Sequence, residues 1–472
     1  MIDIFHSGKV GNNILFIDRN RAKDYFFIII LSGLNAQFCY FTQSCVNKKI
    51  LLLKIMKTKY TLFVCLLLVI SNAYSQKRII PGAERMDQYL PLLKGKSVAV
   101  FANQTSMVGN TNLVDTLLKR GVKVVRIFGP EHGFSGTADA GEKVGNSIDK
   151  KTGIEVVSLY GKHFKPSPED LKGVDIMIFD LQDVGVRFYT YINSLQHYME
   201  AALENSIPLL ILDRPNPNGF YVDGPVLDLK YKSGVGMQPI PIVYGLTMGE
   251  YAMMMGGEKW LSDAANKKYA YYQHAKNSID SPFHFMVIKN ENYDHNSKYI
   301  LPVKPSPNLP DIQSIYLYPS TCFFEGTTLS EGRGTEKPFQ IFGDPSLPKN
   351  LFSFTPNPTE GAKHSKHYGE VCYGWNLSGT PSEVLKKTDR HIQLKWLMEA
   401  YRLFPDKDSF FIVPKSGNME NSFFDKLAGN NELWQQIKNG VSEKAIRASW
   451  EPALNNYKKI RKKYLLYKDF SQ

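Results

Sequence analysis

Cysteine is scarce in this chain: five occur among 472 residues, and only Cys322 and Cys372 lie beyond residue 75. Neither has a partner at metal-ligand spacing, which excludes a zinc site built from thiolates. The spacings H-x-H and H-E-x-x-H are also missing, so the sequence offers no motif for a catalytic metal. The two cysteines could form one disulfide in an oxidising compartment, but the sequence alone does not assign it.

Basic runs with interleaved aromatic residues are absent, which argues against a nucleic-acid partner. The basic tail at residues 458–463 is typical of the solvated face of a helix. The net charge is +12, and about half of it lies within the first 75 residues, so the remainder is only mildly basic. The glycine-rich stretch 129–136 lacks the G-x-G-x-x-G spacing of dinucleotide-binding loops, and we expect no cofactor.

No apolar run is long enough to span a bilayer, which takes about 20 residues. The most apolar stretch, residues 61–70, follows the charged residues of 56–60 and precedes a small-x-small pattern at 73–75. This order predicts a signal peptide over residues 56–75, with Met56 as the functional start and Gln76 as the first mature residue.

This prediction leaves residues 1–55 as an upstream extension. The alternative is a membrane anchor that uses the apolar run 25–34, but that run is too short to cross a bilayer. Cys65 lacks the preceding residues of a lipidation site, so we expect no stable membrane anchor after cleavage. The expected location is periplasmic or secreted.

Short apolar runs alternate with helical stretches from residue 97 onward. Helical patterns cover residues 113–120 and 191–204. The apolar runs have the length of buried parallel strands, and they lie at residues 97–102, 122–128, 156–159, 175–179 and 208–212. Strands separated by helices indicate βαβ units, so we predict an α/β fold with a Rossmann-like parallel sheet.

The second half of the chain has a different pattern. Thr247 and Glu250 form a capping box before a helix, and residues 283–289 are expected to be a late strand. Four prolines within residues 301–310 favour a stiff connector. We therefore predict a Rossmann-like domain over 76–300 and a smaller α+β domain over 301–472, with an active-site cleft between them. Within the second domain we expect a strand at 315–324 and helices at 391–403 and 452–467.

Polar residues follow three of the predicted strands, where parallel α/β proteins bind their ligands. Glu131 and His132 come after the run 122–128, in a stretch rich in glycine. The carboxyl group of Glu131 could act as a general acid or base. The alternative is that Glu131 caps the next element and His132 packs.

The next strand, at 175–179, is followed by Asp180, Asp183, Arg187 and Tyr189. Arg187 can bind a carboxylate with two parallel hydrogen bonds, either on a substrate or on Asp183. An internal pair with Asp183 would merely order the loop.

Two further stretches offer polar groups. Asp213 and Asn216 follow the run 208–212 in a proline-rich turn, which is also typical of a structural turn with an aspartate cap. Glu325 and Arg333 lie among small residues in the second domain, where an ordinary polar hairpin is the alternative. A site in a cleft between the domains would use both.

Five stretches, in this order, resemble the NamZ-like exo-β-N-acetylmuramidase family: GPEHGF, DLQDVGVRFYTY, LDRPNPNG, PIVYGLTMGE and EGRGTEKPF. The resemblance covers about residues 80–472. It implies a Rossmann-like domain, a smaller C-terminal domain and a cleft between them. It also implies release of N-acetylmuramic acid from the non-reducing ends of peptidoglycan chains, with Glu131 in the place of the family's catalytic glutamate. Residues 343–345 read Gly-Asp-Pro where we expect Gly-Ala-Pro, a departure that affects none of the candidates.

Glycoside hydrolysis needs a proton donor at the leaving oxygen, and a carboxyl group serves when its pKa is raised. Glu131 is our candidate for this acid. For the second role we expect Asp183 first, with His132 as a further catalytic candidate and Asp180 and Glu325 behind them. The lactyl carboxylate of muramic acid calls for a cation, and Arg187 and Arg333 are the predicted ones.

Two alternatives stay open at this point. The first is a metal-dependent hydrolase that uses Glu131, His132, Asp180 and Asp183. The second is a protein that binds cell-wall fragments and has lost catalysis. In each case the expected partner is a saccharide derived from peptidoglycan.

Overall fold

The computed structural model describes residues 77–139, 141–142, 145–275, 284–417, 419 and 422–471, together with four strands near the N-terminus. Two compact units are present, Met1–Arg78 and Ile79–Gln472. The strands of the first unit form an antiparallel sheet in sequence order: β1 (Ser7–Val10), β2 (Asn13–Asp18), β3 (Tyr25–Ser32) and β4 (Asn35–Thr42). The predicted signal peptide, residues 56–75, lies outside the described residues.

A seven-stranded sheet forms the centre of the second unit. Its strands are β5 (Ser97–Ala102), β8 (Lys123–Gly129), β9 (Ser147–Ile148), β10 (Glu155–Ser158), β11 (Ile176–Asp180), β12 (Leu209–Leu212) and β13 (Phe285–Ile288). The order is β13-β12-β11-β5-β8-β10-β9, and all pairs are parallel except β10 with β9. Read from β10 to β13, this is the strand order of the Rossmann fold, with β5 at the point where the winding reverses. The predicted α/β class and parallel sheet are confirmed.

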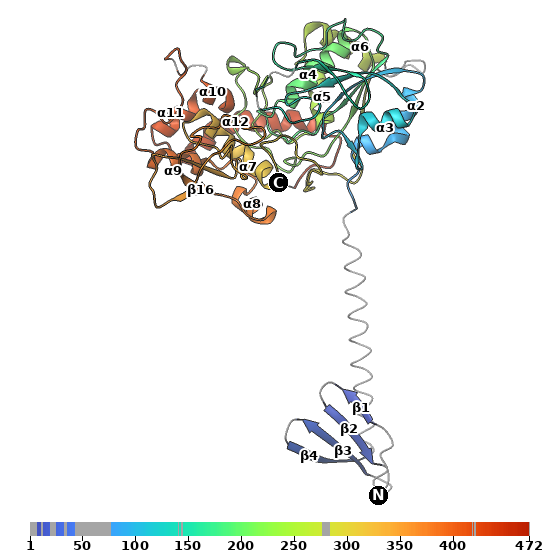
Figure 1. Ribbon diagram of the computed structural model, residues 1–472, viewed down its shortest axis with the longest axis vertical. Coiled ribbons are helices and arrows are strands. Elements are labelled where there is room, and N and C mark those ends of the chain that lie inside the picture. The colour runs from blue at the N-terminus through green and yellow to red at the C-terminus, as the bar shows by residue number, and fades with distance from the viewer. Residues whose placement is uncertain are drawn as a thin grey trace. The chain divides into compact units, whose positions relative to one another are not determined.

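Helices cover both faces of this sheet (Figure 1). Along β5, Ala99 and Phe101 point into the core beneath α4, whereas Val98 and Val100 point into the core that includes α3. Both faces are apolar because both are buried, as expected of a parallel sheet. The helices and short elements of this region are η1 (Gly82–Glu84), α2 (Met86–Leu93), β6 (Met107–Val108), β7 (Thr111–Asn112), α3 (Leu113–Lys119), α4 (Tyr191–Glu204), η2 (Leu229–Tyr231), α5 (Met248–Gly257) and α6 (Asp263–Ala275).

The capping box that opens α5 is present as predicted: the Thr247 side chain accepts from the Glu250 N–H, and the Glu250 side chain accepts from the Thr247 N–H. These reciprocal bonds satisfy two of the backbone donors that a helix start leaves unpaired.

The C-terminal part is smaller and mixed. Its elements are α7 (Ile312–Thr321), η3 (Cys322–Gly326), β14 (Ile341–Asp344), β15 (Phe352–Phe354), β16 (Cys372–Asn376), α8 (Pro381–Thr388), α9 (Leu394–Leu403), α10 (Phe423–Ala428), α11 (Glu432–Lys438), α12 (Glu443–Arg461) and η4 (Lys462–Tyr464). The three strands pair antiparallel in the order β14-β16-β15. The predicted strand at 315–324 is wrong, because these residues are helical and belong to α7 and η3. From residue 314 to the end of η3, every residue except Glu325 is buried. The helical run therefore faces protein on every side.

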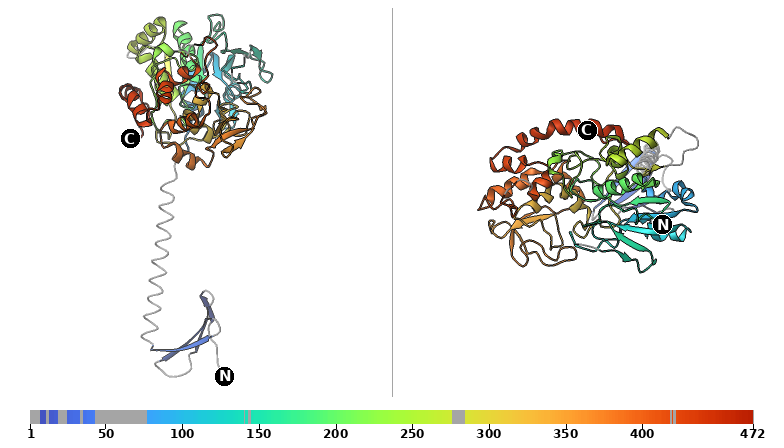
Figure 2. Two further views of the ribbon diagram at one scale, coloured as in Figure 1. Left: turned by 90° about the vertical axis from the view of Figure 1, so that its left-hand side faces the viewer. Right: turned by 90° about the horizontal axis from the view of Figure 1, so that it is seen from above.

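The end of the chain returns to the Rossmann-like part, and α12 lies over both parts of this unit (Figure 2). The Tyr457 hydroxyl donates to the Tyr244 carbonyl at 2.7 Å, and Nε of Arg461 donates to the Gly245 carbonyl at 2.7 Å. Beyond α12, the N–H of Leu466 donates to the buried Glu250 carboxylate at 2.8 Å. The last helix and the tail are therefore part of the packing of the first domain.

Cys322 and Cys372 are both buried and both free, so the disulfide that the sequence allowed is not formed. None of the helices among the described residues has both the length and the apolarity that crossing a membrane requires.

Hydrogen bonds of Arg187 connect the Rossmann-like part with the C-terminal part. Its side chain is fully buried, and Nη1 donates to the carbonyls of Pro225 and Ile240 at 2.9 and 2.8 Å. Nη2 donates to the carbonyls of Leu427 and Ala428, each at 2.8 Å. The last two residues form the end of α10, where the helix dipole favours a cation. Burial lowers the pKa of Arg187 to about 9, so the guanidinium remains charged at neutral pH.

We predict that Arg187→Met lowers the free energy of unfolding by about 3–5 kcal/mol, because four buried carbonyls lose a charged donor. Thermal melting of the variant and the parent provides the measurement. Arg402→Met, at an exposed arginine near the end of α9, serves as the control and should melt like the parent. An Arg187→Met variant that also melts like the parent would show that this tie is dispensable.

Candidate active site

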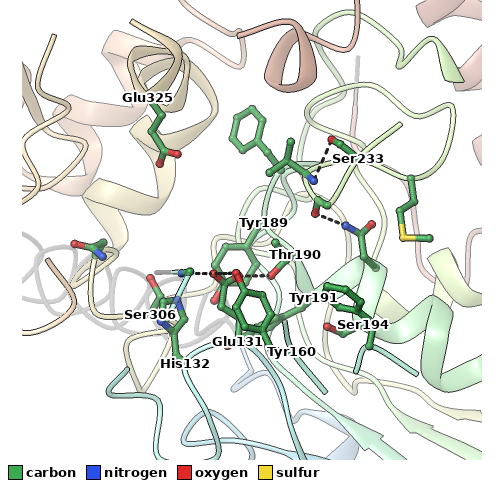
Figure 3. Close-up of a pocket in the computed structure, with 18 of the residues that line it drawn as sticks. Glu131, His132, Tyr160, Tyr189, Thr190, Tyr191, Ser194, Ser233, Ser306 and Glu325 are labelled. Carbon is green, nitrogen blue, oxygen red and sulfur yellow. Dashed lines mark hydrogen bonds between the residues drawn. The ribbon is translucent and has the colours of Figure 1, made fainter. Parts of the chain in front are cut away.

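A pocket of about 700 Å³ opens at the carboxyl ends of the central strands, where the winding of the sheet reverses. Loops after β8, β10 and β11 form one side, and segments of the C-terminal part form the other. Figure 3 shows many of the residues that line it. From the Rossmann-like part they include Glu131, His132, Tyr160, Tyr189, Thr190 and Tyr191, and from the C-terminal part Ser306, Asn308, Tyr318, Glu325, Arg333 and Phe339. The predicted cleft thus uses both parts of the chain.

Glu131 lies in this pocket, two residues after the end of β8. One carboxylate oxygen accepts from the Tyr160 hydroxyl at 2.8 Å and from the Gly141 N–H at 3.0 Å. The other accepts from the Thr190 hydroxyl at 2.9 Å. Figure 3 shows Tyr160 and Thr190 directed toward Glu131. Three neutral donors from three separate loops therefore fix the carboxyl group in place.

His132 has an unusual backbone. Its φ is 68°, in the left-handed region, and Gly133 follows with a φ of 75°. Left-handed backbone is costly for a residue with a Cβ, although histidine adopts it more often than most other residues. Nδ1 of His132 lies 2.6 Å from the Ala138 carbonyl, which holds the ring against the loop. This turn directs Glu131 into the pocket as the chain leaves β8.

Arg333 and Glu325 form a charged group on the C-terminal side of the pocket. Nη2 of Arg333 lies 2.6 Å from Glu325, and Nε lies 3.2 Å from the buried Glu331. Burial alone would lower the pKa of Arg333, but Glu325 and Glu331 raise it. Both predicted residues of this stretch reach the pocket, although the two glutamates already pair with the arginine.

Tyr189 also reaches the pocket, as predicted for a substrate-binding residue. Its hydroxyl donates to the Pro305 carbonyl at 2.9 Å, across the proline-rich connector. Tyr191 next to it accepts from the Asn103 side chain at 2.8 Å. Burial raises the pKa of both phenols, so they stay neutral and present aromatic faces and hydroxyl groups to the pocket.

Asp183 lies outside the pocket lining. It is buried, and one carboxylate oxygen accepts from the Tyr244 hydroxyl and from the Gly185 N–H. Its other oxygen, Oδ1, is buried without a hydrogen-bond partner in the described part of the chain. Burial raises the pKa of Asp183 to about 7, although the bonds from Tyr244 and Gly185 oppose the shift.

Asp180 and Asp213 also serve the fold in this structure. Both carboxylate oxygens of Asp180 accept from the Arg214 guanidinium, at 2.6 and 2.9 Å, and both side chains are buried. Asp213 accepts from the Tyr467 hydroxyl at 2.6 Å and from the Gly249 N–H at 2.9 Å.

Asn216 and Arg187 lie away from the pocket lining too. The Asn216 amide donates to the Leu246 carbonyl at 2.8 Å, and its oxygen accepts from the Asn218 N–H. The interaction that the sequence suggested between Arg187 and Asp183 is replaced by the bonds of Arg187 to backbone carbonyls. Of the residues predicted from sequence, the structure thus brings together Glu131, His132, Tyr189, Glu325 and Arg333.

The four residues of the metal alternative do not converge. Glu131 and His132 line the pocket, whereas Asp180 pairs with Arg214 and Asp183 is buried beside Tyr244. Across the described residues, no group of three or more His, Cys, Asp or Glu side chains is placed to hold a metal ion.

Sequence reasoning missed Tyr160, Thr190 and Lys232, which all line the pocket. Tyr160 follows the predicted strand at 156–159, so its position at the carboxyl end of β10 was a usable signal. Thr190 lies within the DLQDVGVRFYTY stretch, directly after the candidate Tyr189. Lys232 lies in a loop with no strand before it, and nothing in the sequence distinguishes it.

Comparison with known proteins gives a consistent result. Residues 98–313 match the family model described as exo-beta-N-acetylmuramidase NamZ, N-terminal, and residues 316–467 match its C-terminal counterpart. The peptidoglycan beta-N-acetylmuramidase NamZ of Bacillus subtilis (strain 168) is 39% identical over 406 residues, which cover 81% of this chain and 89% of that protein.

Two solved structures are also similar, both of DUF1343 family proteins from Bacteroides fragilis NCTC 9343. One is 44% identical with a TM-score of 0.72, and the match covers 83% of this chain and 100% of that one. The other is 28% identical with a TM-score of 0.66, over 83% of this chain and 99% of that one. Because the two family models together span both parts of the unit that contains the pocket, the chain belongs to the exo-β-N-acetylmuramidase NamZ family.

Proposed function

We propose that this protein is an exo-acting β-N-acetylmuramidase that releases N-acetylmuramic acid from the non-reducing ends of peptidoglycan fragments. The observation that carries the proposal is the placement of Glu131, the counterpart of the family's catalytic glutamate, in a pocket that both parts of the chain enclose. Family membership supports the reaction class, and the size of the pocket suits a small saccharide.

Glu131 is the proposed general acid at the leaving oxygen. Its side-chain partners, the Tyr160 and Thr190 hydroxyls, can each donate or accept a hydrogen bond. They can therefore hold the carboxyl group in one place before and after it gives up its proton, which a lysine or arginine partner could not do. This property suits a residue that changes protonation state in each catalytic cycle.

Glu325 is the second carboxylate on the pocket wall, and it replaces Asp183 as our first candidate for the remaining role. Arg333 fixes its orientation through the contact at 2.6 Å. A carboxylate held in this way can stabilise the positive charge of an oxocarbenium-like transition state or activate water.

A second cavity of about 440 Å³ shares Arg333 and Gly141 with the pocket, and we place the leaving part of the glycan there.

The non-catalytic alternative predicts binding of wall fragments without turnover. The intact Glu131 with three hydrogen bonds argues against it. Release of the chromophore from a chromogenic muramic glycoside would exclude it, and release that continues in the presence of a chelator would exclude the metal alternative.

We predict that Glu131→Gln lowers kcat by about 10²–10⁴-fold on a chromogenic muramic glycoside, because the amide cannot donate the carboxyl proton. The melting temperature should stay close to that of the parent, since Glu131 is not a core residue. Glu169→Gln, at a surface carboxylate that is 86% exposed, is the control and should retain full activity. A folded Glu131→Gln variant with more than about a tenth of the parental rate would move the acid role to another residue.

The pKa of Asp183 yields a second prediction. The native state holds a proton on this carboxyl up to about pH 7, whereas an unfolded chain releases it near pH 4. Between these values the native state binds more protons, so this residue makes stability fall as pH rises. Asp183→Asn should remove this contribution, and its melting temperature relative to the parent should increase from pH 4 to pH 7.

Activity of the same variant tests the catalytic hypothesis for Asp183. Since the side chain lies outside the pocket lining, Asp183→Asn should keep kcat within about threefold of the parent. If the difference in melting temperature between Asp183→Asn and the parent stays constant from pH 4 to pH 7, the buried, protonated state is contradicted. A folded variant that loses about 100-fold or more in kcat would restore Asp183 as a catalytic residue.

We also propose that the protein is exported, to the periplasm or beyond, after cleavage between Ser75 and Gln76. The signal-like pattern of residues 56–75 supports this, and the compact unit with the pocket begins shortly afterwards, at Ile79. Mass spectrometry of the protein expressed with its full leader should show a chain that begins at Gln76. An exported protein that retains Met1 would contradict both the start site and the signal.

A further inference from the structure

The pocket has another wall, which the proposed chemistry does not use. It consists of residues 232–235 and Met237. Ser233 and Gly236 exchange two backbone hydrogen bonds, at 2.8 and 3.1 Å, and so close a tight turn. The Asn193 side chain of α4 donates to the Gly234 carbonyl at 2.6 Å, and Gly236 packs so closely on Arg187 that an added Cβ would lie 3.3 Å from Cδ. The turn is therefore held rigidly at the edge of the pocket.

This turn carries Lys232, a cation on the pocket wall. Within the described part of the chain, the exposed Lys232 side chain has no ion pair or hydrogen bond. Arg333, in contrast, is engaged by Glu325 and Glu331. A cation held at a pocket edge without a protein partner remains available to a ligand.

His197 does not add to this charge. Burial lowers its pKa most, and the nearby Lys165 and Lys232 lower it further, against the opposing effect of Glu200. The imidazole is therefore neutral at physiological pH.

An exposed aromatic ring completes the wall. Phe164 lines the pocket and is 47% exposed, with its ring centroid 6.2 Å from that of Tyr160 and 6.1 Å from that of His197. Tyr160 is the partner of Glu131, so this aromatic group includes the residue that holds the proposed acid. An apolar ring and a cation on the walls of one pocket match a sugar ring that bears an anionic substituent.

We propose that Lys232 binds a carboxylate of the substrate and thereby selects muramic sugars over neutral amino sugars. The inference rests on the proposed function. The carboxylate has two possible sources with the same chemistry: the lactyl group of N-acetylmuramic acid itself, or the terminal carboxylate of a peptide joined to that lactyl group. Lys232 takes the role that the sequence suggested for Arg187, which is buried, and for Arg333, which is paired.

Three chromogenic glycosides separate these sources: one of N-acetylmuramic acid, one with its lactyl carboxylate converted to a carboxamide, and one with L-alanine on the lactyl group. If Lys232 binds the lactyl carboxylate, the parent should favour the free acid over the carboxamide in kcat/KM, and if it binds the peptide carboxylate, the parent should favour the alanine conjugate. Lys232→Ala should lose about 10- to 100-fold on the substrate whose carboxylate it binds, through KM rather than kcat, and little on the carboxamide. Lys232→Arg should keep most of the preference, and Lys162→Ala, at an exposed lysine outside the pocket lining, should behave like the parent.

A loss on the free acid alone assigns the lactyl carboxylate, and a loss on the alanine conjugate alone assigns the peptide carboxylate. If Lys232→Ala discriminates between all three substrates as the parent does, the proposal is wrong. Calorimetric binding of free N-acetylmuramic acid to Glu131→Gln, with and without Lys232→Ala, measures recognition without turnover. A parent that cleaves no muramic glycoside yet binds N-acetylmuramic acid through Lys232 would contradict the proposed function and leave this inference standing.

Discussion

The hydrogen bonds of the Arg187 guanidinium connect three segments that are far apart in the sequence. They reach the carbonyls of Pro225 and Ile240 and the last two residues of α10. Gly429, which ends α10, has a φ of 80°, and a Cβ there would lie 2.7 Å from Nη2 of Arg187. The glycine thus allows both the left-handed turn and the close approach of the guanidinium.

The walls of the pocket depend on this buried cation. Thr190, three residues after Arg187, donates to Glu131, and the turn with Lys232 packs against Arg187 through Gly236. Phe423 at the start of α10 also lines the pocket. One guanidinium outside the pocket lining therefore packs against or precedes the segments that carry Thr190, Lys232 and Phe423.

The charged groups at the pocket lie in separate places. Glu131 is surrounded by neutral donors, whereas the paired charges of Arg333, Glu325 and Glu331 lie on the C-terminal side. Figure 3 draws Glu325 well apart from Glu131. If the proposed proton donor Glu131 lay in contact with this ion pair, the nearby charges would change its pKa. Their separation leaves each group available to a different part of the substrate.

The sheet was predictable because buried parallel strands are short, apolar and bounded by polar residues. β5 was predicted to the residue, and the neighbouring strands to within one or two. The same criterion failed at α7, since a helix buried on all sides has an apolar run without a distinctive period. The capping pair of Asp311 and Ser314 was the local signal for the helix.

Among the candidate site residues, sequence could find the polar loops but not decide which side chains face the pocket. Asp180 and Glu131 both follow apolar strands, yet Asp180 meets Arg214 and Glu131 meets hydroxyl groups. The difference lies in partners distant in the sequence. Asp213 shows this dependence on distant partners most clearly, because the hydroxyl of Tyr467, far along the chain, donates to its carboxylate.

That contact has a consequence for how the protein is made. The carboxylate of Asp213, at the end of a central strand, and Glu250 in α5 receive their donors from Tyr467 and Leu466. Until the ribosome has released residues 466 and 467, two buried acids of the first domain each lack one of their hydrogen-bond donors. The Rossmann-like part therefore reaches its final state only after residues 466 and 467 have left the ribosome, although its own sheet is complete long before.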